Sequence, residues 1–409
     1  MFNKRYVNPW TILLAILSLV GLGAWVYQLT NGLIATGMRN IVSWGLYITF
    51  FMFFVGLSAG GLIVSSSATV FNIKQFKPVA KPAVLLSITC IIVAILLIFV
   101  DIGRPDRVLN LVFHPQFNSP LTWDVVVITL YLVISLLYLY NMTRAMPNER
   151  NVKVLSAIAL PVAILVHTVT AWIFGLLIAR PTWHSALMAP LFVASALDSG
   201  LALLVIVLIG LNKLSSFKVE KKLISTLGGL LAVFIAVDVY FVFSEILTAL
   251  YPSEEQLMGY LTLLLSGSLA PFFWGEIILG AVVPFLILVV PKNRIKSSLM
   301  VLVSALVVVG VLFKRIWLLF SSLLLPLVGL APGVTLGAYQ MPQTFGKAAS
   351  PDIWATVGSY APTWVELAIV VGVCAFGALI FTVGTYFFLT PVQQTAEALP
   401  KQGGTVSAT

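Results

Sequence analysis

Ionisable side chains are scarce in this sequence, and several of them interrupt long apolar runs. Asp124 stands near the start of one run and His167 lies in the middle of another. Either side chain can accept and release a proton once its surroundings tune its pKa. If these runs cross a membrane, each ionisable group costs about 2.5–3.5 kcal/mol on insertion scales and usually has a function or a partner. Asp124 and His167 are therefore candidates for a function or a buried partner, and a lone histidine on an apolar helix is by default a hydrogen-bonded core residue.

The segment Asp101–Arg107 alternates two acids with two arginines in a tight turn. Gly103 and Pro105 end the preceding helix. Two roles are compatible with this pattern. Asp–Arg pairs could clamp the helix end, or Arg104 could orient a ligand carbonyl or hydroxyl at the rim of a polar pocket.

Two groups of polar residues are expected. The first gathers at one face of the membrane and contains Asp101, Arg104, Asp106, Arg107, His114, Asp124 and His167. The second lies in the other half of the chain, where Asp238, Glu245 and Glu276 can neutralise Lys314 and Arg315; Asp198 joins these five as a residue of a possible proton path. The second group is either a buried ion-pair network that fixes helix packing or a proton path.

Metal and haem sites are not predicted. Cys90 and Cys374 each stand alone in an apolar run, so no spacing for an iron–sulfur cluster or a structural zinc ion is present. His114 and His184 fall in loops, whereas bis-histidine haem ligation needs two facing histidines.

The composition predicts an all-α integral membrane protein, a single polytopic domain over 1–409. Apolar residues make up 60% of the chain and charged residues only 9%, against roughly a quarter charged in soluble domains. Barrel strands give a weaker apolar signal than these long runs. The net charge of +9 sits in short clusters between runs, which indicates membrane orientation rather than nucleic-acid binding.

About ten spans are expected, because a crossing needs about 20 apolar residues. The first follows Lys4 and Arg5 and is interpreted as a retained helix, not a signal peptide. The expected spans are 10–29, 43–71, 83–101, 123–141, 154–179, 187–211, 223–249, 268–290, 298–320 and 363–388. The run 257–265 is too short to cross, 321–362 forms a long outer loop, and 390–409 is a polar tail.

Lysine and arginine predict the orientation. Sixteen of the 23 basic residues lie at the N-terminus, in the loops after the second, fourth, sixth and eighth spans, or in the tail. The opposite loops hold only Arg39, Arg104, Arg107, Arg180 and Lys347. The positive-inside rule then places both termini in the cytoplasm of a cell (inner or plasma) membrane.

A faint internal repeat predicts two related four-helix bundles, 43–179 and 187–320, with the first and tenth helices peripheral. Ser58-Ala-Gly-Gly61 resembles Ser195-Ala with Gly200, and Pro120-Leu-Thr-Trp-Asp124 resembles Pro271-Phe-Phe-Trp-Gly-Glu276. Both pairs point the same way through the membrane, as in a parallel repeat.

Several of these segments resemble the NrfD/polysulfide-reductase membrane-subunit family. The resemblance rests on His167–Gly175, Arg180–Gly200, Trp44–Tyr47 with Ser58–Gly61, the Asp101–Arg107 turn, Pro120–Asp124 and Ala270–Trp274. It covers the second to eighth spans. Asp198 departs from the pattern, since a neutral residue is common there.

The resemblance implies a haem-free, quinone-reactive anchor without an iron–sulfur cluster of its own. Menaquinone or ubiquinone would bind in the first bundle, and the partners would be a ferredoxin-like iron–sulfur subunit and a molybdopterin catalytic subunit. Carried over by position, His167 and Asp124 are the catalytic candidates. The quinone-binding candidates are Arg104, Tyr47, Asp101 and His114.

A chain without metal ligands can accept protons from quinol but cannot store electrons, so the pocket must be shallow and close to the docked partner. Trp44, Tyr47 and Trp123 would flank the ring or form an interfacial aromatic belt. The rival hypothesis is a secondary transporter or proton-conducting membrane protein, whose polar site should lie near the membrane midplane.

Overall fold

The described residues of the computed structural model are 7–39, 42–144, 146, 148–215, 217–325 and 360–389. Within these ranges the regular elements are all helical, and ten helices are long and apolar enough to cross a membrane. This confirms the predicted all-α, multi-pass membrane fold. Most of the expected outer loop 321–362, including Lys347, and the whole tail 390–409 lie outside the described residues.

The observed spans agree with the predicted ones to within a few residues at most ends. They are α1 (Pro9–Asn31), α2 (Leu46–Val70), α3 (Ala80–Asp101), α5 (Pro120–Thr143), α6 (Glu149–Gly175), α7 (Met188–Leu214), α8 (Lys221–Leu250), α10 to α11 (Ala270–Val289), α13 (Ser297–Leu323) and α14 (Trp364–Phe388). The largest shift is at α6, which begins five residues before the expected 154. Asn148 accepts hydrogen bonds from the backbone N–H groups of Arg150 and Asn151, and this N-cap extends the helix into a polar segment.

The span 270–289 is not a uniform α-helix. It begins as α10 (Ala270–Trp274), continues as the π-helix η4 (Gly275–Val282) and ends as α11 (Val283–Val289). A π-helical turn widens the backbone and often marks a functional or crowded position. Here Gly280 faces Gly310 of α13 so closely that a Cβ atom would lie 2.6 Å from the Gly310 Cα.

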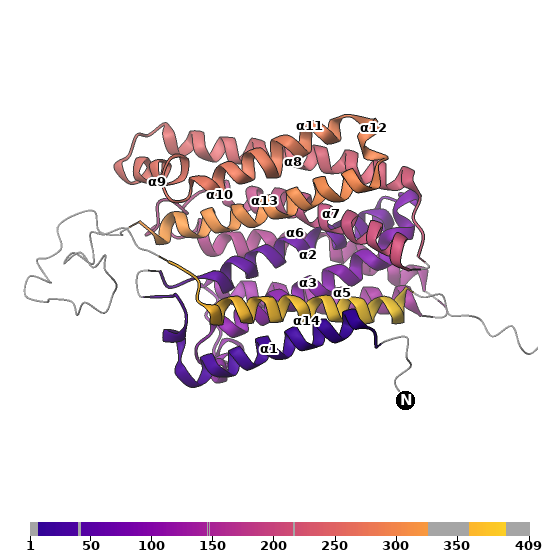
Figure 1. The fold of residues 1–409 in the computed structure, drawn as a ribbon, viewed down its shortest axis with the longest axis horizontal. Helices are drawn as coiled ribbons and strands as arrows, with labels where there is room; N and C mark the ends of the chain where they lie inside the picture. Colours follow the sequence, from indigo (N-terminus) through magenta and orange to yellow (C-terminus); the bar gives the residue numbers. More distant parts are fainter. Residues whose placement is uncertain are drawn as a thin grey trace, which may run out of the picture.

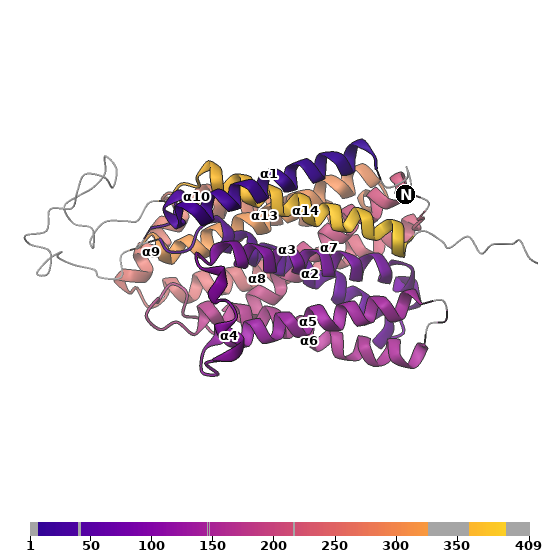
Figure 2. The same ribbon diagram turned by 90° about the horizontal axis from the view of Figure 1, so that it is seen from below.

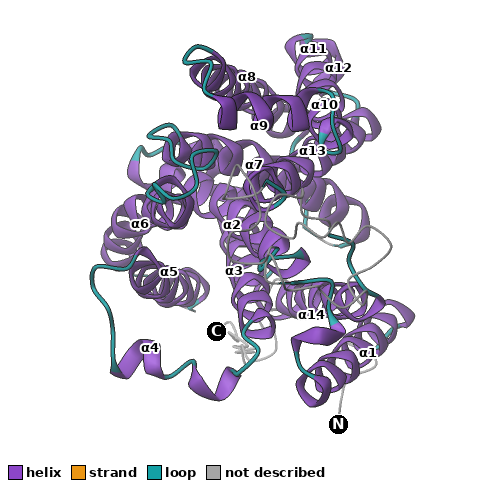
Figure 3. Ribbon diagram, turned by 90° about the vertical axis from the view of Figure 1, so that its left-hand side faces the viewer, coloured by secondary structure: helices purple, strands orange, loops and turns teal. Residues whose placement is uncertain are grey.

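Two rings of packed helices form the body of the molecule, and Figure 3 shows them end on. In the first ring α2 packs on α3 and α6, and α5 packs on both α3 and α6. In the second, α7 packs on α8 and α13, and the 270–289 span packs on both α8 and α13. The rings meet where α2 packs on α7, at a Gly60–Gly200 contact in which a Cβ on Gly60 would lie 2.3 Å from the Gly200 carbonyl carbon. The internal repeat itself stays a prediction.

Helices α1 and α14 lie side by side along the outside of the first ring, where α14 packs on α3 (Figures 1 and 2). The short helix α9 (Glu255–Leu265) lies at the left-hand end of the molecule in Figure 1. The start of α1 at Pro9 and α12 (Pro291–Arg294) lie at the right-hand end, so the basic segment after the eighth span shares an end with the start of α1 (Figure 1). The left-hand end, which faces outside under the predicted orientation, is called the outer end below.

Candidate functional site

Asp124 is buried against α6 at the outer end of the first ring. Pro120 starts α5, which places Asp124 one turn into the helix with only 2% of the residue exposed. Its Oδ1 accepts a hydrogen bond of 2.6 Å from the Thr170 hydroxyl, and Thr170 is itself buried. No ion pair of Asp124 with a described residue is found, so a single hydroxyl holds this carboxyl group.

His167 lies one turn deeper on the same helix as Thr170. Its Nδ1 is 2.8 Å from the Ala163 carbonyl, an arrangement in which Nδ1 carries the proton. Its Nε2 is therefore assigned as the acceptor; it is buried and has no hydrogen-bond partner among the described residues. The ring faces the backbone of α2 at Val55 and Gly56. The imidazole thus has one nitrogen fixed and one nitrogen ready to accept a proton.

The two groups lie at shallow depth. At 1.5 Å per residue, Asp124 is about 6 Å below the outer end of α5, and His167 is about 12 Å below the outer end of α6. On its other face α5 exposes Trp123 and Val126, each 46% accessible, as expected of a helix in contact with lipid. The site is therefore one helix away from the bilayer and within one or two turns of the outer surface.

An aromatic cluster joins the segment before α2, the outer end of α6 and the α6–α7 connection. Trp44 stacks on Trp183 at 6.0 Å between centroids, and Phe174 meets both edge-on. Trp183 donates its indole N–H to the Leu318 carbonyl at 2.8 Å. Trp44 thus packs in a fixed aromatic cluster, whereas Trp123 is part of the exposed surface and donates to the Phe117 carbonyl.

Arg104 and His114 do not join Asp124 and His167, contrary to the expected gathering. The Arg104 side chain is 66% exposed and forms an ion pair of 3.1 Å with Asp106, which stabilises the charged forms and lowers the pKa of Asp106. His114 ends the short helix α4 (Asn110–Phe113) and is exposed, as is Arg107. The reason is the length of the α3–α5 connection, which carries these side chains out over the rim.

Tyr47 belongs to a different network, which fastens α1 and α14 to the first ring, and Asp101 lies beside it. The Tyr47 hydroxyl donates to Gln28 Oε1 at 2.5 Å, and Gln28 donates to the Val100 carbonyl beside Asp101. Asp101 is mostly buried, and its Oδ1 has no hydrogen-bond partner among the described residues. Tyr47 therefore points toward α1, away from Asp124.

Glu366 completes that outer network and was not among the residues predicted from the sequence. It is fully buried, accepts hydrogen bonds from the backbone N–H groups of Gly37 and Thr363, and accepts one from the Tyr360 hydroxyl at 2.5 Å. Burial, together with the neighbouring Glu366 carboxylate, raises the pKa of the Tyr360 hydroxyl. Thr363 followed three residues later by Glu366 is a capping-box pattern, and this signal was available in the sequence.

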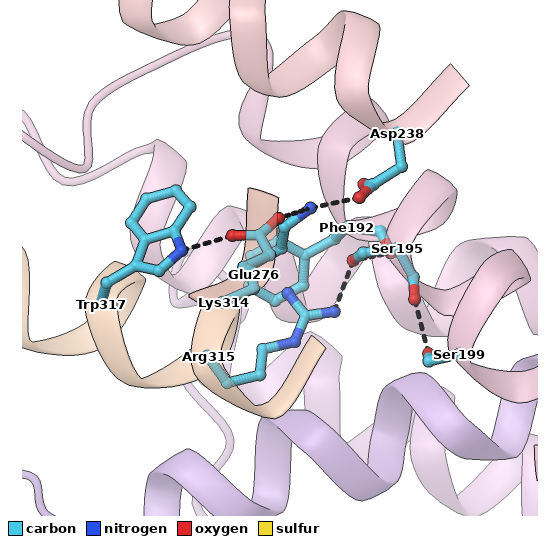
Figure 4. Close-up of polar contacts among 8 residues, drawn as sticks. All are labelled: Phe192, Ser195, Ser199, Asp238, Glu276, Lys314, Arg315 and Trp317. Atoms are coloured by element: carbon cyan, nitrogen blue, oxygen red, sulfur yellow. Dashed lines mark hydrogen bonds and ion pairs between the residues drawn. The ribbon is translucent and has the colours of Figure 1, made fainter. Parts of the chain in front are cut away.

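Lys314 is the centre of the second polar region, drawn in Figure 4. Its ammonium group forms ion pairs with Asp238 at 2.5 Å and with Glu276 at 2.9 Å, and it is completely buried. Glu276 also accepts a hydrogen bond of 2.5 Å from the Trp317 indole. Three spans of the second ring, α8, 270–289 and α13, are therefore linked through one side chain.

Arg315 points the other way, toward the first ring. It donates to Ser195 Oγ at 2.7 Å, and its guanidinium lies 4.2 Å from the centroid of the Phe192 ring (Figure 4). Its Nη2 is close enough to α2 that a Cβ on Gly56 would lie 3.4 Å away. Arg315 makes no ion pair within the described part of the chain, which corrects the expectation that acids of this group neutralise it.

Glu245 also departs from the expected ion-pair network, and Asp198 lies outside the observed ion pairs. Asp198 is 3% exposed, and its Oδ1 has no hydrogen-bond partner among the described residues. Glu245 lies nearer the outer end of α8 and accepts a hydrogen bond of 2.7 Å from Ser185 instead of joining Lys314. Within the described part of this group, the ion pairs thus involve Asp238, Glu276 and Lys314 only.

Two surface clefts of the described structure have neither Asp124 nor His167 among their lining residues. One, of about 450 Å³, runs between α8 and α11. The other, of about 430 Å³, lies between α6, α7 and α8 and is lined by Thr168, the residue after His167. In the residues described, no group of three or more histidine, cysteine, aspartate and glutamate side chains is arranged to hold a metal ion.

Thr170 is the residue nearest the predicted chemistry that sequence reasoning missed, because a threonine in an apolar helix carries no signal of its own. Its spacing of three residues from His167 places both on one helix face, but the contact with Asp124 follows only from the packing of α5 on α6.

Comparison with known proteins gives one family and several full-length relatives. The family model described as "Polysulphide reductase, NrfD" matches residues 35–326. The chain is 39% identical to a putative dimethyl sulfoxide reductase membrane subunit of Halobacterium salinarum, over 95% of this chain and 92% of that protein. It is 27% identical to a selenate reductase subunit of Mesobacillus selenatarsenatis, over 94% and 93% of the two chains. It is 28% identical to the Hdr-like menaquinol oxidoreductase integral membrane subunit of Archaeoglobus fulgidus, over 97% of each chain.

Proposed function

The chain belongs to the NrfD polysulphide reductase family, and from that premise we propose that it is the quinone-reactive membrane anchor of a multi-subunit respiratory oxidoreductase. The names of the relatives include the membrane subunits of a reductase and of a menaquinol oxidoreductase, which supports a quinone as the substrate. Of the two quinones considered, menaquinone is the one to which a relative's name points.

One observation carries the proposal. A buried carboxyl group and a buried imidazole nitrogen without a partner among the described residues lie within one or two turns of the outer surface, on helices that border lipid. A quinol diffuses in the bilayer and must give up two protons at a place from which its electrons can reach another chain. The Asp124–His167 pair offers both proton acceptors.

The chemistry follows from the two groups. Quinol oxidation breaks two O–H bonds and yields quinone, two electrons and two protons. His167 Nε2 accepts one proton, and the Asp124 carboxylate accepts the other while the Thr170 hydroxyl holds it in place. The electrons pass to a redox cofactor of a partner subunit docked on the outer face. In the opposite direction the same groups donate protons to a quinone being reduced.

The partner side of the proposal rests on the outer rim. Arg104, Arg107 and His114 are exposed at the end of the molecule nearest Asp124, and we assign them to the docking face instead of to the quinone ring. The partners of this proposal are a ferredoxin-like iron–sulfur subunit and a molybdopterin catalytic subunit. The predicted placement is the cell membrane, with both termini in the cytoplasm and the docking face outside.

The test uses the assembled complex in membranes. Asp124→Asn and His167→Ala should each lower quinol oxidation by at least about a hundredfold, the contribution typical of a positioned acid or base. Turnover with a soluble dye donor that bypasses the quinone should be unchanged, and the partner subunits should still copurify. Glu149→Gln, an exposed acid at the opposite end of α6, is the matched control. Normal quinol oxidation in both variants would reject the assignment.

A second function, proton uptake into the membrane, is favoured by the composition of the second polar region. Three buried acids, Asp198, Asp238 and Glu276, face two buried cations, Lys314 and Arg315, so one bound proton brings the group to electrical neutrality. If protons move through this group, quinol turnover in proteoliposomes should change the pH of the lumen by more than the protons released by the quinol reaction itself can explain. Asp198→Asn should abolish that excess while quinol oxidation continues; an unchanged excess would reject the path.

A further inference from the structure

The groove between α8 and α11 is a membrane-facing cleft whose walls are unequal. On the α8 side it is lined by small residues, Gly229, Ala232 and Ala236, and on the α11 side by Phe285 and Val289. Ala236 is exposed, as are Val233 and Tyr240 on the same helix, so the cleft opens to lipid and not into the protein core. Small side chains opposite large ones leave a channel along the helices.

Arg294 lies at the inner end of this groove, and part of its guanidinium group remains available to donate a hydrogen bond to a ligand. Its Nε and Nη2 donate to the carbonyl groups of Leu288 and Val289, which end α11. The guanidinium lies flat on α8 because Gly229 has no side chain: a Cβ there would be 2.7 Å from Nη1. No hydrogen bond from Nη1 to a described residue is found, and Arg294 lines the groove. A positively charged donor therefore faces the channel.

Lys222 adds a second positive charge, nearer the inner surface than Arg294. Counted along α8, Lys222, Thr226, Gly229, Val233 and Ala236 recur at spacings of four and three residues, so they share one helix face. Lys222 is exposed two turns below Gly229. The basic residues at this mouth are Lys221, Lys222, Lys292, Arg294 and Lys296, and the neighbouring acid in α8's cap is Glu220.

The length of the groove fits one leaflet. From Gly229 to Tyr240 the helix rises about 16 Å at 1.5 Å per residue, and half of a 30 Å hydrocarbon core is about 15 Å. An acyl or isoprenoid chain lying there would keep its polar end beside Arg294 and Lys222. A free phosphate ion would use only the charged end and leave the apolar walls unfilled.

We propose that the α8–α11 groove binds one anionic phospholipid, with its phosphate held between Arg294 Nη1 and Lys222 and one hydrocarbon chain along Val233 and Ala236. The lipid carries a net negative charge because five basic residues surround the mouth. The bound chain fills the seam between α8 and α11, and α8 and the 270–289 span, to which α11 belongs, are two of the three spans linked by the Asp238–Lys314–Glu276 ion pairs.

The experiment is native mass spectrometry of the full chain after delipidation and titration with equal amounts of phosphatidylglycerol and phosphatidylcholine. The wild-type chain should retain one phosphatidylglycerol. Lys222→Gln, an exposed change that cannot disturb the core, should weaken that retention about fivefold, which corresponds to about 1 kcal/mol for one basic residue. Ala236→Trp should expel the lipid by filling the groove.

The second cleft provides the matched control. It is of similar volume, about 430 Å³, but has no basic residue among its lining residues. Val193→Trp in that cleft should leave phosphatidylglycerol retention unchanged. Equal retention of the two lipids by the wild-type chain would overturn the proposal, as would unchanged retention in both Lys222→Gln and Ala236→Trp. Displacement of the bound lipid by inorganic phosphate alone would show a simple anion site and also overturn it.

Discussion

The two polar regions of this molecule differ in that, among the described residues, only the second contains buried ion pairs. Around Lys314, one cation is bound by two carboxylates, and one of these is also bound by an indole N–H. Around His167, an imidazole nitrogen has no partner among the described residues, and Asp124 is held by one hydroxyl. An ion-paired network resists change, because removing one member leaves another charge buried alone. An unsaturated pair can accept protons and a ligand without first breaking an ion pair.

The same contrast distinguishes groups that hold the first ring together from groups that could react with a ligand. The outer network of Glu366, Tyr360 and Gln28 is extensively hydrogen-bonded, and it fastens α1, α2 and α14 together. Tyr47 is occupied in that network through its bond to Gln28. Asp124 and His167 lie outside it, on α5 and α6.

The largest effect is expected from Lys314→Met. The substitution leaves Asp238 and Glu276 buried without a counter-charge, which should destabilise the protein by about 3–5 kcal/mol. Thermal unfolding in detergent measures this. The triple variant with Asp238→Asn and Glu276→Gln should recover much of the loss, because no charge is then left unpaired. A single variant as stable as the wild type would show that the region is not a structural clamp.

Thr170→Val should act on turnover more than on stability. It removes the hydroxyl that holds Asp124, and a hydrogen bond to a charged group contributes about 1.5 kcal/mol, equivalent to about tenfold in rate. Quinol oxidation by the assembled complex should fall by that factor, while dye-driven turnover stays constant. Thr168→Val, on the exposed side of the same helix, is the control. Equal losses in the two variants would remove the special role of Thr170.

Asp124→Asn should change the free energy of unfolding by no more than about 1 kcal/mol, since no buried cation among the described residues pairs with this carboxylate and the amide oxygen can still accept from Thr170. The comparison with Lys314→Met, measured in the same detergent, tests the difference between the two regions. A loss as large as that of Lys314→Met would mean that Asp124 also belongs to a structural network.

Arg104→Gln should have the smallest effect on the chain itself. Arg104 is exposed and pairs with Asp106, and such surface pairs contribute little. Unfolding should be unchanged, and any loss should appear as weaker copurification of the iron–sulfur partner. If the variant lost affinity for quinol but still bound its partner, Arg104 would belong to the quinone pocket and not to the docking face.

Much of the fold could be predicted from apolar run length. All ten predicted spans are found, because in a bilayer each run of about 20 apolar residues must form a helix that satisfies its own backbone. The π-helix at Gly275–Val282 could not be predicted, since it depends on how closely Gly280 and Gly310 approach across two helices.

The candidate site was predictable only in part. Residue type and depth singled out Asp124 and His167, and both are buried on neighbouring helices. The direction of each side chain was not predictable. Arg104 lies on the long α3–α5 connection and is exposed, and the Tyr47 hydroxyl donates to Gln28 on α1. Sequence position gives the height of a side chain in the membrane, but which helix it faces is set by packing.

The most direct test of the central claim is photolabelling of the assembled complex with an azido-quinone that competes with the natural quinol, followed by peptide mapping. The label should be found on α5 near Asp124 and on α6 near His167, and excess quinol should remove it. Labelling confined to the second ring, with α5 and α6 unmodified, would contradict a quinone site at Asp124 and His167.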